Sequence, residues 1–412
     1  MKKIYLIISI LFIATSLHAQ LDTTGGRYCT QNFFSAVTVT SNVTYGSAIT
    51  SSGNPQTLLM DIYQPTGDVA ATRGLIVFAH GGSFIGGSKT DQDVTTLATR
   101  FAKMGYVTCS IEYRVGMFPI DSVQATKAVV RATQDMKAAV RFFRKDAATT
   151  NTYRIDPTFI IVGGSSAGAF MALHLAYLDR MAEALAWQQS AITAVGGLDG
   201  TSGNPGYSSL TNAVINLCGA LGDSIWLENG NIPLVSMHGT NDATVPYGTA
   251  MISVLGFPIM VVDGSASIKM RADNVGVWNP FHTWYGADHV PYAGTSATAI
   301  SYMDSTVEFI RAFLCPIVSA PSIFTNVKEI TSAQGFSVYP NPSNGNFTVR
   351  FAEAVSGRSL QITDVSGRLV EQVQLIGTEY SYSGAKLNAG IYFVKVISAN
   401  RDEAVQKIII AE

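Results

Sequence analysis

Ser166 is the residue of this chain whose surroundings most directly suggest chemistry. It lies in Phe159–Phe170, where four apolar residues lead into Gly-Gly-Ser-Ser-Ala-Gly. Residues 164–168 fit the pattern G-x-S-x-G, which places a serine hydroxyl at a sharp turn from a strand into a helix. Such a hydroxyl becomes a nucleophile only when a base, oriented by an acid, removes its proton. Because glycine and serine are common, a glycine-rich turn without chemistry is the alternative interpretation.

Two histidines late in the chain are candidate bases, His282 in Asn-Pro-Phe-His and His289 in Gly-Ala-Asp-His. We favour His289, because it directly precedes the last expected helix, where the chain order serine, acid, histidine places the base. The other histidines are interpreted as organisers of turns (His80, His238), as a core or helix-surface residue (His174) and as part of the N-terminal leader (His18).

The acid is expected on a loop after a late strand. Asp242 follows the apolar run 232–237 and therefore fits this place, and its alternative role is a turn beside Pro246. Three other aspartates compete for the role but follow no equally clear strand: Asp223, Asp263 and Asp288.

A second glycine-rich segment, His-Gly-Gly-Ser-Phe at residues 80–84, follows the apolar run that ends at Ala79. Backbone N–H groups in such a loop can stabilise the oxyanion that forms when a serine attacks a carbonyl group. We expect these donors at Gly82, Ser83 and Ala167. The segment could instead cradle a phosphate, although it lacks the Lys-Ser/Thr pair of a P-loop.

Short apolar runs alternate with longer amphipathic stretches from Leu58 onward. The expected strands are residues 58–65, 74–82, 106–114, 158–166, 213–221 and 232–240, and the expected helices are 94–105, 122–150, 165–189 and 296–314. This alternation predicts an α/β domain with a doubly wound, mostly parallel sheet that helices cover on both faces. Ligand sites in such sheets lie beyond the carboxyl ends of the strands. Four polar residues lie at or just after the end of an expected strand: His80, Glu112, Ser166 and Asp242.

The two ends of the chain predict export. Residues 1–19 carry two lysines, a short apolar core and a small residue at Ala19, which is the layout of a cleaved signal peptide for export to the periplasm. An uncleaved anchor is the alternative, but the apolar core is shorter than the about 20 residues of a membrane span. The formal net charge of −2, without a basic run, argues against a nucleic-acid partner.

Four cysteines are widely spaced and form no C-x-x-C pair, so the sequence indicates neither a zinc nor a redox site. Cys109 and Cys218 lie in apolar runs and are interpreted as buried free thiols. Cys29 and Cys315 lie near the two ends of the large domain and could form a disulfide in an exported protein.

Four domain segments follow from these patterns. We expect a signal peptide at residues 1–19, a catalytic domain at 20–315, a linker at 316–334 with Pro316 and Pro321, and a small all-β sandwich at 335–412. The last segment alternates apolar and polar residues between Pro, Asn and Gly turns, which favours short strands.

The large domain resembles the carboxylesterase/lipase group of α/β-hydrolases over residues 58–314. The resemblance rests on residues 80–88 (HGGSFIGGS), 110–116 (SIEYRVG), 135–169 and 238–246 (HGTNDATVP). It implies an α/β-hydrolase fold with Ser166 as nucleophile, His289 as general base, Asp242 as its orienter, and Gly82, Ser83 and Ala167 as the oxyanion hole. Ser83 and Ala169 depart from the family, which usually has glycine at both positions.

The tail resembles the C-terminal sorting domain of type IX secretion cargo in FSVYPNPSNGNFTV, DVSGRLV, LNAGIYFVKV and the final KIII. This resemblance implies a secreted or surface-attached protein with the type IX machinery as a partner. A carbohydrate-binding or spacer sandwich is the alternative.

Together the two resemblances imply a secreted serine esterase without a metal or organic cofactor, acting on carboxylic esters such as acetyl or feruloyl esters of polysaccharides. A peptidase of the same fold and an inactive binding module are the alternatives. The segments 196–210 and 263–286 could line the pocket, with Trp278, Phe281, Trp284 and Tyr285 as an apolar wall or as ordinary packing residues.

Overall fold

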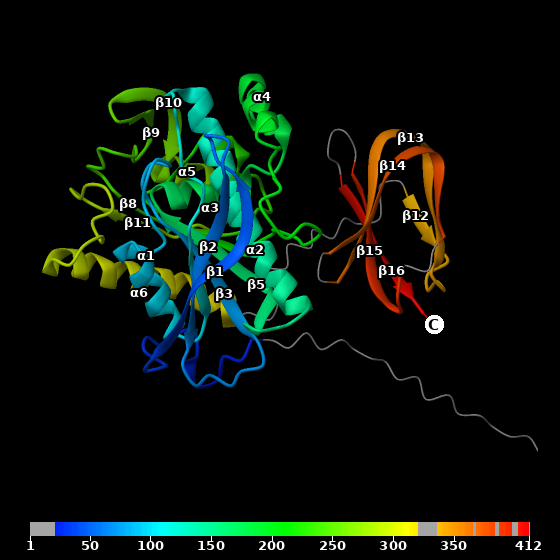
Figure 1. Ribbon diagram of the computed structural model, residues 1–412, viewed down its shortest axis with the longest axis horizontal. Coiled ribbons are helices and arrows are strands. Elements are labelled where there is room, and N and C mark those ends of the chain that lie inside the picture. Colours follow the sequence, from blue (N-terminus) through cyan, green and yellow to red (C-terminus); the bar gives the residue numbers. More distant parts are fainter. Residues whose placement is uncertain (1–20, 320–335, 366–367, 384–386, 398–402, 412) are drawn as a thin grey trace, which may run out of the picture.

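A central eight-stranded sheet organises the large domain (Figure 1). The computed structural model describes residues 21–319, 336–365, 368–383, 387–397 and 403–411, so the expected signal peptide lies outside the described residues. In spatial order the strands are β1 (Val37–Ile49), β2 (Pro55–Pro65), β4 (Val107–Ile111), β3 (Arg73–Ala79), β5 (Ile155–Ser165), β6 (Ala213–Leu217), β8 (Leu234–Gly239) and β11 (Phe281–Trp284). All neighbours from β4 to β11 are parallel, whereas β2 is antiparallel to both its neighbours. The predicted mostly parallel sheet is therefore confirmed.

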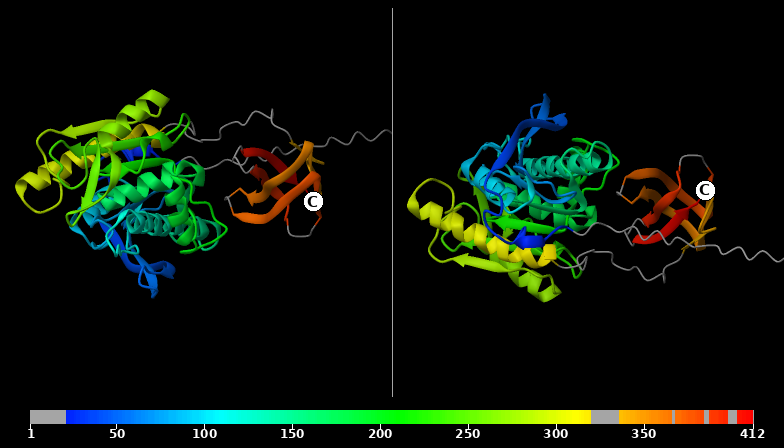
Figure 2. Two further views of the ribbon diagram at one scale, coloured as in Figure 1. Left: turned by 90° about the horizontal axis from the view of Figure 1, so that it is seen from above. Right: turned by 90° about the horizontal axis from the view of Figure 1, so that it is seen from below.

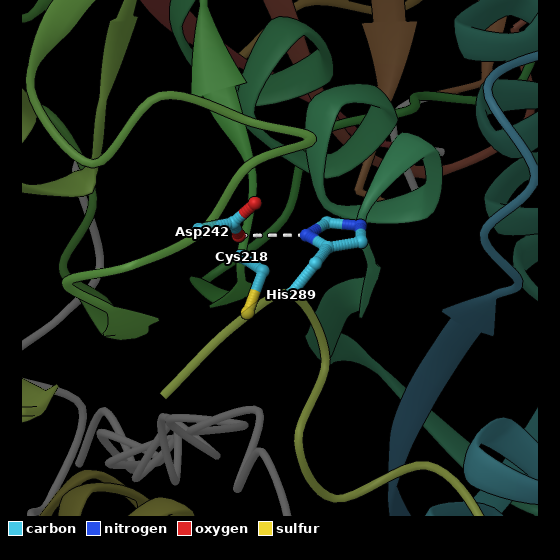
Figure 3. A group of neighbouring side chains, drawn as sticks. All are labelled: Cys218, Asp242 and His289. Atoms are coloured by element: carbon cyan, nitrogen blue, oxygen red, sulfur yellow. Dashed lines mark hydrogen bonds and ion pairs between the residues drawn. The ribbon is translucent and has the colours of Figure 1, made fainter. Parts of the chain in front are cut away.

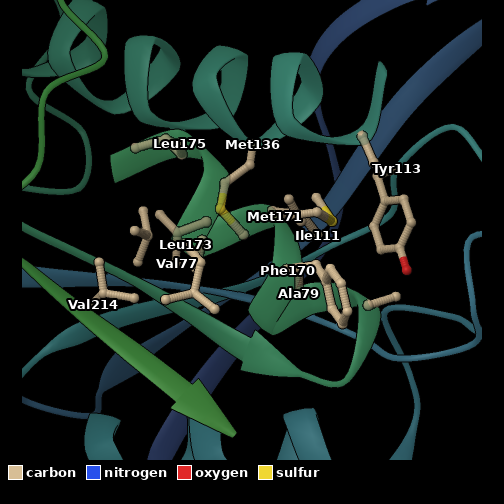
Figure 4. Packing of buried hydrophobic residues seen from close by; sticks show 14 of the residues in the cluster. Val77, Ala79, Ile111, Tyr113, Met136, Phe170, Met171, Leu173, Leu175 and Val214 are labelled. Atoms are coloured by element: carbon tan, nitrogen blue, oxygen red, sulfur yellow. The ribbon is translucent and has the colours of Figure 1, made fainter. Parts of the chain in front are cut away.

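Helices cover both faces of this sheet (Figure 2). Alternate side chains of β3 point to opposite faces, as the pleat requires. Leu75, Val77 and Ala79 belong to the core beneath α2 (Ser122–Ala148) and α3 (Ala167–Tyr177), and Figure 4 shows Val77 and Ala79 close to these helices. Ile76 and Phe78 pack on the other face with α1 (Gln92–Ala102) and α6 (Ala297–Ser319). Because β3 is buried on both faces, it is an unbroken apolar run in the sequence.

The stretch 165–189, expected to be one helix, is divided in the structure. It forms α3, the short 3-10 helix η2 (Met181–Glu183) and the start of α4 (Ala186–Ala194). Leu178 leaves helical geometry with φ −95° and ψ 78°. The Glu183 carboxylate accepts hydrogen bonds from the N–H groups of Asp179 and Arg180, and such local bonds offer the backbone an alternative to the helix. The break allows α4 to take its own direction.

A second, three-stranded sheet follows β6. It has the order β7-β10-β9, with β7 (Ala220–Leu221), β9 (Thr249–Val254) and β10 (Phe257–Gly264). The remaining elements are η1 (Thr24–Gly26), η3 (Ser224–Trp226) and α5 (Ser265–Val275).

A disulfide joins Cys29 to Cys315, with the Cα atoms 5.2 Å apart, so the pairing considered from the sequence is present. Cys109 and Cys218 are buried free thiols, as expected. Helix α6 continues past the disulfide to Ser319 because Ile317 and Val318 are buried in the core, each 3% exposed. Residues 316–319, which we expected in the linker, are therefore helical despite Pro316.

The C-terminal segment forms an all-antiparallel sheet. Its strands are β12 (Phe336–Tyr339), β13 (Asn346–Asp364), β14 (Leu369–Ser383), β15 (Gly390–Ile397) and β16 (Glu403–Ile410). They enclose a separate apolar core, to which Val349, Leu360, Val394 and Ile408 contribute fully buried side chains. Among the described residues, no helix is both long and apolar enough to cross a membrane.

Candidate active site

Ser166 occupies a strained turn between β5 and α3. Its φ of 52° and ψ of −116° lie in a region that non-glycine residues rarely adopt, and it directly precedes the first residue of α3. The Ser166 N–H donates to the carbonyl oxygen of Leu217 at 2.8 Å, which ties the turn to the end of β6. Strain of this kind persists where the surrounding structure enforces it, and it is concentrated at functional sites.

Gly164 and Gly168, the two glycines of G-x-S-x-G, permit this turn because the chain passes close to the end of β3. A Cβ atom at Gly164 would lie 2.4 Å from the Ala79 carbonyl oxygen, and one at Gly168 only 2.0 Å from it. No side chain fits at these distances. The pattern therefore has a packing reason, independent of any chemistry at Ser166.

His289 lies between Ser166 and Asp242. Its Nε2 is 2.8 Å from Ser166 Oγ, and its Nδ1 is 2.7 Å from Asp242 Oδ2. Figure 3 shows the Asp242–His289 bond. A carboxylate only accepts, so Nδ1–H donates to Asp242 and Nε2 is left to accept the Ser166 proton. The three residues follow β5, β8 and β11, whose carboxyl ends lie at the same edge of the sheet.

The Asp242 carboxylate has a complete set of hydrogen bonds. Oδ1 accepts from the N–H groups of Thr244 and Val245 at 2.9 and 2.8 Å, and Oδ2 lies 3.1 Å from His238 Nε2 in addition to His289. Burial alone would raise the pKa of Asp242, but the hydrogen bonds from His238 and His289 outweigh it and hold this pKa well below its ordinary value. Asp242 is therefore a permanent negative charge beside His289.

His238 is the functional neighbour that the sequence analysis missed. It is fully buried, and Ser265 Oγ lies 2.8 Å from its Nδ1, which leaves Nε2 directed at Asp242 and at the Val245 carbonyl oxygen. We had interpreted it as an organiser of a turn. Its position four residues before Asp242 was the available signal.

The competing candidates lie elsewhere. His282 packs against the rings of Trp284 and Phe309, with centroids 5.9 and 5.4 Å away. Asp288 accepts from the N–H groups of Ala243 and His289 and so braces the loop rather than the imidazole. The other two aspartates bond to Ile225 (Asp223) and to Thr249 and Ser224 (Asp263).

Cys218 lies next to Asp242 and His289, so that three potential metal-ligand atoms are within 4.8 Å of one another (Figure 3). Burial raises the pKa of the Cys218 thiol well above its ordinary value, which disfavours the thiolate that a metal would require. His289 Nδ1 is already engaged by Asp242. We therefore interpret Cys218 as a packing residue.

Two of the three expected oxyanion donors share a cavity with Ser166. Ser83 and Ala167 line the same cavity as Ser166, whereas Gly82 is not part of its wall. Ala167 is the first residue of α3, so its N–H has no acceptor within the helix. Gly82, Ser83 and Phe84 all have positive φ, and the turn is closed by hydrogen bonds from the N–H groups of Ile85 and Gly86 to the Gly82 carbonyl oxygen.

His80 braces this turn from within the core. Its ring stacks on Tyr113 with centroids 4.2 Å apart, and the Tyr113 hydroxyl donates to the carbonyl oxygens of His80 and Gly81. This agrees with its interpretation as an organiser of the turn.

A largely apolar cavity of about 860 Å³, including its open mouth, extends from Ser166. Its walls come from α2, α3, α4, Trp226 and the β9–β10 hairpin, with Val129, Phe170, Ile192 and Ile259 as examples.

The segments 196–210 and 263–286 do not contribute to this wall, contrary to one of our expectations. Trp278 packs on Phe313, Trp284 packs on Tyr292 and Tyr302, and Phe281 packs on Tyr247. Tyr285 is 86% exposed. Trp278, Phe281 and Trp284 therefore serve packing, and the β9–β10 hairpin and the helices α2 to α4 supply the cavity wall instead.

Two family models match the chain. Residues 60–220 match the family described as BD-FAE, and residues 337–411 match the secretion system C-terminal sorting domain. The chain carries an α/β-hydrolase domain of the BD-FAE type and a sorting domain. The sorting domain indicates secretion or attachment at the cell surface.

Curated relatives match the chain over a limited length. Carboxylesterase 3B of Mus musculus is 32% identical over 120 residues, which are 29% of this chain and 20% of that protein. Neuroligin-like protein glit-1 of Caenorhabditis elegans is 31% identical over 114 residues, 27% of this chain and 15% of that protein. The chain thus spans at most about a fifth of these relatives' own length.

The fold is also that of a solved esterase structure. Thermogutta terrifontis esterase 2, phosphoramylated by tabun, aligns with a TM-score of 0.50 and 22% sequence identity, covering 68% of this chain and 94% of that chain. At this identity the likeness shows the α/β-hydrolase fold alone.

Proposed function

We propose that the protein is a secreted serine esterase that hydrolyses carboxylic esters through an acyl-enzyme. The observation that carries the proposal is the hydrogen-bonded chain from Ser166 Oγ through His289 to Asp242, at 2.8 and 2.7 Å, beside an apolar cavity. The BD-FAE match and the carboxylesterase relative support the same reaction class.

In the first half of the reaction, Ser166 Oγ attacks the ester carbonyl carbon while His289 Nε2 takes the serine proton. The N–H groups of Gly82, Ser83 and Ala167 stabilise the oxyanion. The C–O bond to the alcohol then breaks, and His289 returns the proton to the leaving oxygen, which leaves an ester on Ser166.

In the second half, water attacks the acyl-enzyme and His289 takes the proton of the water. Breakdown of the second tetrahedral intermediate releases the carboxylic acid, and Ser166 recovers its proton from His289. Asp242 keeps its charge throughout and stabilises the imidazolium that forms in each half.

The cavity favours acyl groups larger than acetyl. Its largely apolar wall suits an alkyl or aryl acid. Of the polysaccharide esters considered from the sequence, feruloyl esters match this apolar wall better than acetyl esters. We propose that the leader and the sorting domain together deliver the enzyme to such substrates outside the cell.

The test is hydrolysis of 4-nitrophenyl acetate, butyrate and octanoate by the mature protein, beside a Ser166→Ala variant. We expect turnover of all three esters, the highest kcat/KM for the longer acyl chains, and loss of at least about 10³-fold in the variant. Circular dichroism of the variant controls for folding. A folded wild type that hydrolyses none of the esters would contradict the proposal.

A further inference from the structure

Four residues at the end and on one face of α3 form a continuous strip of the cavity wall. Ser166, Phe170, His174 and Leu178 are spaced four residues apart, so they project from the same side of the helix, and all four line the cavity. A helix rises about 1.5 Å per residue, which puts the backbone of His174 about 12 Å beyond that of Ser166. The strip therefore runs from the proposed nucleophile along the cavity wall.

His174 brings a polar atom into these apolar surroundings. It is only 8% exposed, and its ring packs against Phe170 and Trp226 with centroids 6.1 and 5.4 Å away. Nδ1 lies 2.8 Å from the Phe170 carbonyl oxygen. Because a carbonyl oxygen can only accept, Nδ1 carries the proton and Nε2 carries a lone pair.

The Nε2 atom of His174 has no hydrogen-bond partner among the described residues, and it is not one of the side-chain atoms sealed inside the protein. It therefore opens on the cavity. Burial lowers the pKa of His174 to about 4, so the ring is neutral at neutral pH and Nε2 accepts rather than donates.

Gln188 of α4 adds a donor to the same cavity. It is 6% exposed, and its Oε1 accepts from the Leu185 N–H at 2.8 Å, whereas its amide nitrogen has no partner among the described residues. None of the described residues that line the cavity is an acid, a lysine or an arginine. The wall thus offers a neutral acceptor at His174 and a neutral donor at Gln188, and a hydroxyl group can pair with either.

We propose that His174, with Gln188, forms a polar subsite that selects acyl groups carrying a hydroxyl at the end remote from the ester. The inference rests on the proposed function, because it takes Ser166 as the position of the ester carbonyl. The hydroxyl donates to His174 Nε2, while the apolar body of the acyl group covers Phe170. An acyl group without the hydroxyl displaces water from Nε2 but donates no hydrogen bond to it. We expect this unpaired acceptor to lower kcat/KM by about ten- to a hundredfold.

The test compares three methyl esters at each of three acyl lengths, C6, C8 and C10: the plain alkanoate, its ω-hydroxy analogue and its ω-methoxy analogue. The measured quantity is the ratio of kcat/KM for the hydroxy ester to that for the plain ester. We expect the wild type to favour the hydroxy ester by at least about tenfold at one length or more. The methoxy ester cannot donate a hydrogen bond, so the enzyme should not favour it over the plain ester.

Two variants isolate the acceptor. His174→Phe keeps a ring between Phe170 and Trp226 but removes the acceptor, so the preference for the hydroxy ester should disappear while the plain ester is still hydrolysed. His174→Gln retains an acceptor oxygen and should restore part of the preference. If the role of His174 were purely structural, its replacement would lower kcat/KM for both esters equally and leave their ratio unchanged.

The outcomes separate the subsite from the reaction. If plain esters are hydrolysed and the ratio is the same in wild type and His174→Phe, the subsite is wrong and the esterase stands. If no ester is hydrolysed, calorimetric binding of the same esters to the Ser166→Ala protein still measures the ratio without turnover. Equal binding of hydroxy and plain esters at every length overturns the subsite in that case.

Discussion

At the residue scale, Asp242 is the most completely satisfied polar group of the candidate site. The N–H groups of Thr244 and Val245 bond to one oxygen, and His289 and His238 approach the other. This arrangement fixes which nitrogen of His289 carries the proton. It also explains why a buried carboxylate remains charged.

We expect Asp242→Asn to lower kcat on 4-nitrophenyl octanoate by about 10⁴-fold, because an amide does not hold His289 with its lone pair toward Ser166. The matched control is Asp288→Asn. Its side chain bonds only to loop N–H groups, and an amide oxygen can accept these bonds, so kcat should change less than about threefold. Similar losses in both variants would show that the loop, rather than the charge of Asp242, supports catalysis.

The lowered pKa of Asp242 also gives a pH dependence with a definite sign. The carboxyl group is charged in the folded protein at pH values where it is already protonated in the unfolded chain. Its contribution to stability is therefore complete above the ordinary pKa of about 3.8 and is lost as the pH falls through the lowered folded value. The difference in Tm between wild type and Asp242→Asn should be constant from pH 7 to about pH 5 and should shrink below about pH 4. A difference that shrinks near pH 6 would contradict this.

At the element scale, the close approach of the β5–α3 turn to the end of β3 determines the position of Ser166. Gly168→Ala would place a Cβ atom 2.0 Å from the Ala79 carbonyl oxygen, so α3 must move away from the end of β3. We expect a loss of about 1–3 kcal/mol in the free energy of unfolding by urea. We also expect at least a tenfold loss of kcat/KM, about 1.4 kcal/mol, since His289 does not move with Ser166.

Gly86→Ala is the control for this substitution. It also adds a methyl group to a glycine close to the site, but a Cβ there would meet nothing within 4 Å. Its stability should stay within about 0.5 kcal/mol of wild type. If the two variants behave alike, the close approach to Ala79 is not what the glycine at 168 provides.

At the scale of the whole molecule, the Cys29–Cys315 disulfide joins the two ends of the hydrolase domain across 286 residues of sequence. Closing so long a loop restricts the unfolded chain strongly. The double variant Cys29→Ser/Cys315→Ser should therefore lose about 2–5 kcal/mol of stability, measured as a lower urea midpoint. The candidate site contains neither cysteine, so kcat at 25 °C should be unchanged.

A reductant tests the same point without mutation. It should lower the urea midpoint of the wild type to that of the double variant and leave the urea midpoint of the double variant unchanged. If the double variant is as stable as the oxidised wild type, the disulfide does not stabilise the protein by restricting the conformations of the unfolded chain.

The sequence by itself determined many of the central strands and helices and their order, because these depend on patterns among neighbouring residues. Apolar runs located β3, β5, β6 and β8, and longer amphipathic stretches located α1, α2 and α6. The glycines around Ser166 revealed the turn, since only glycine allows the backbone to approach Ala79 so closely. Chain order then led to Asp242 and His289, which the structure brings into hydrogen-bond contact, although their roles in catalysis remain proposals.

Tertiary structure alone decided what surrounds that contact. The break after α3, the β9–β10 hairpin over the cavity, the approach of His238 to Asp242 and the opening of His174 Nε2 on the cavity all depend on residues that are far apart in the chain or on how whole elements pack. No local pattern distinguishes a histidine that lines a cavity from one that fills a core. The physical reason is that periodicity records which side of an element is buried, whereas the partner of that side depends on where the other elements lie.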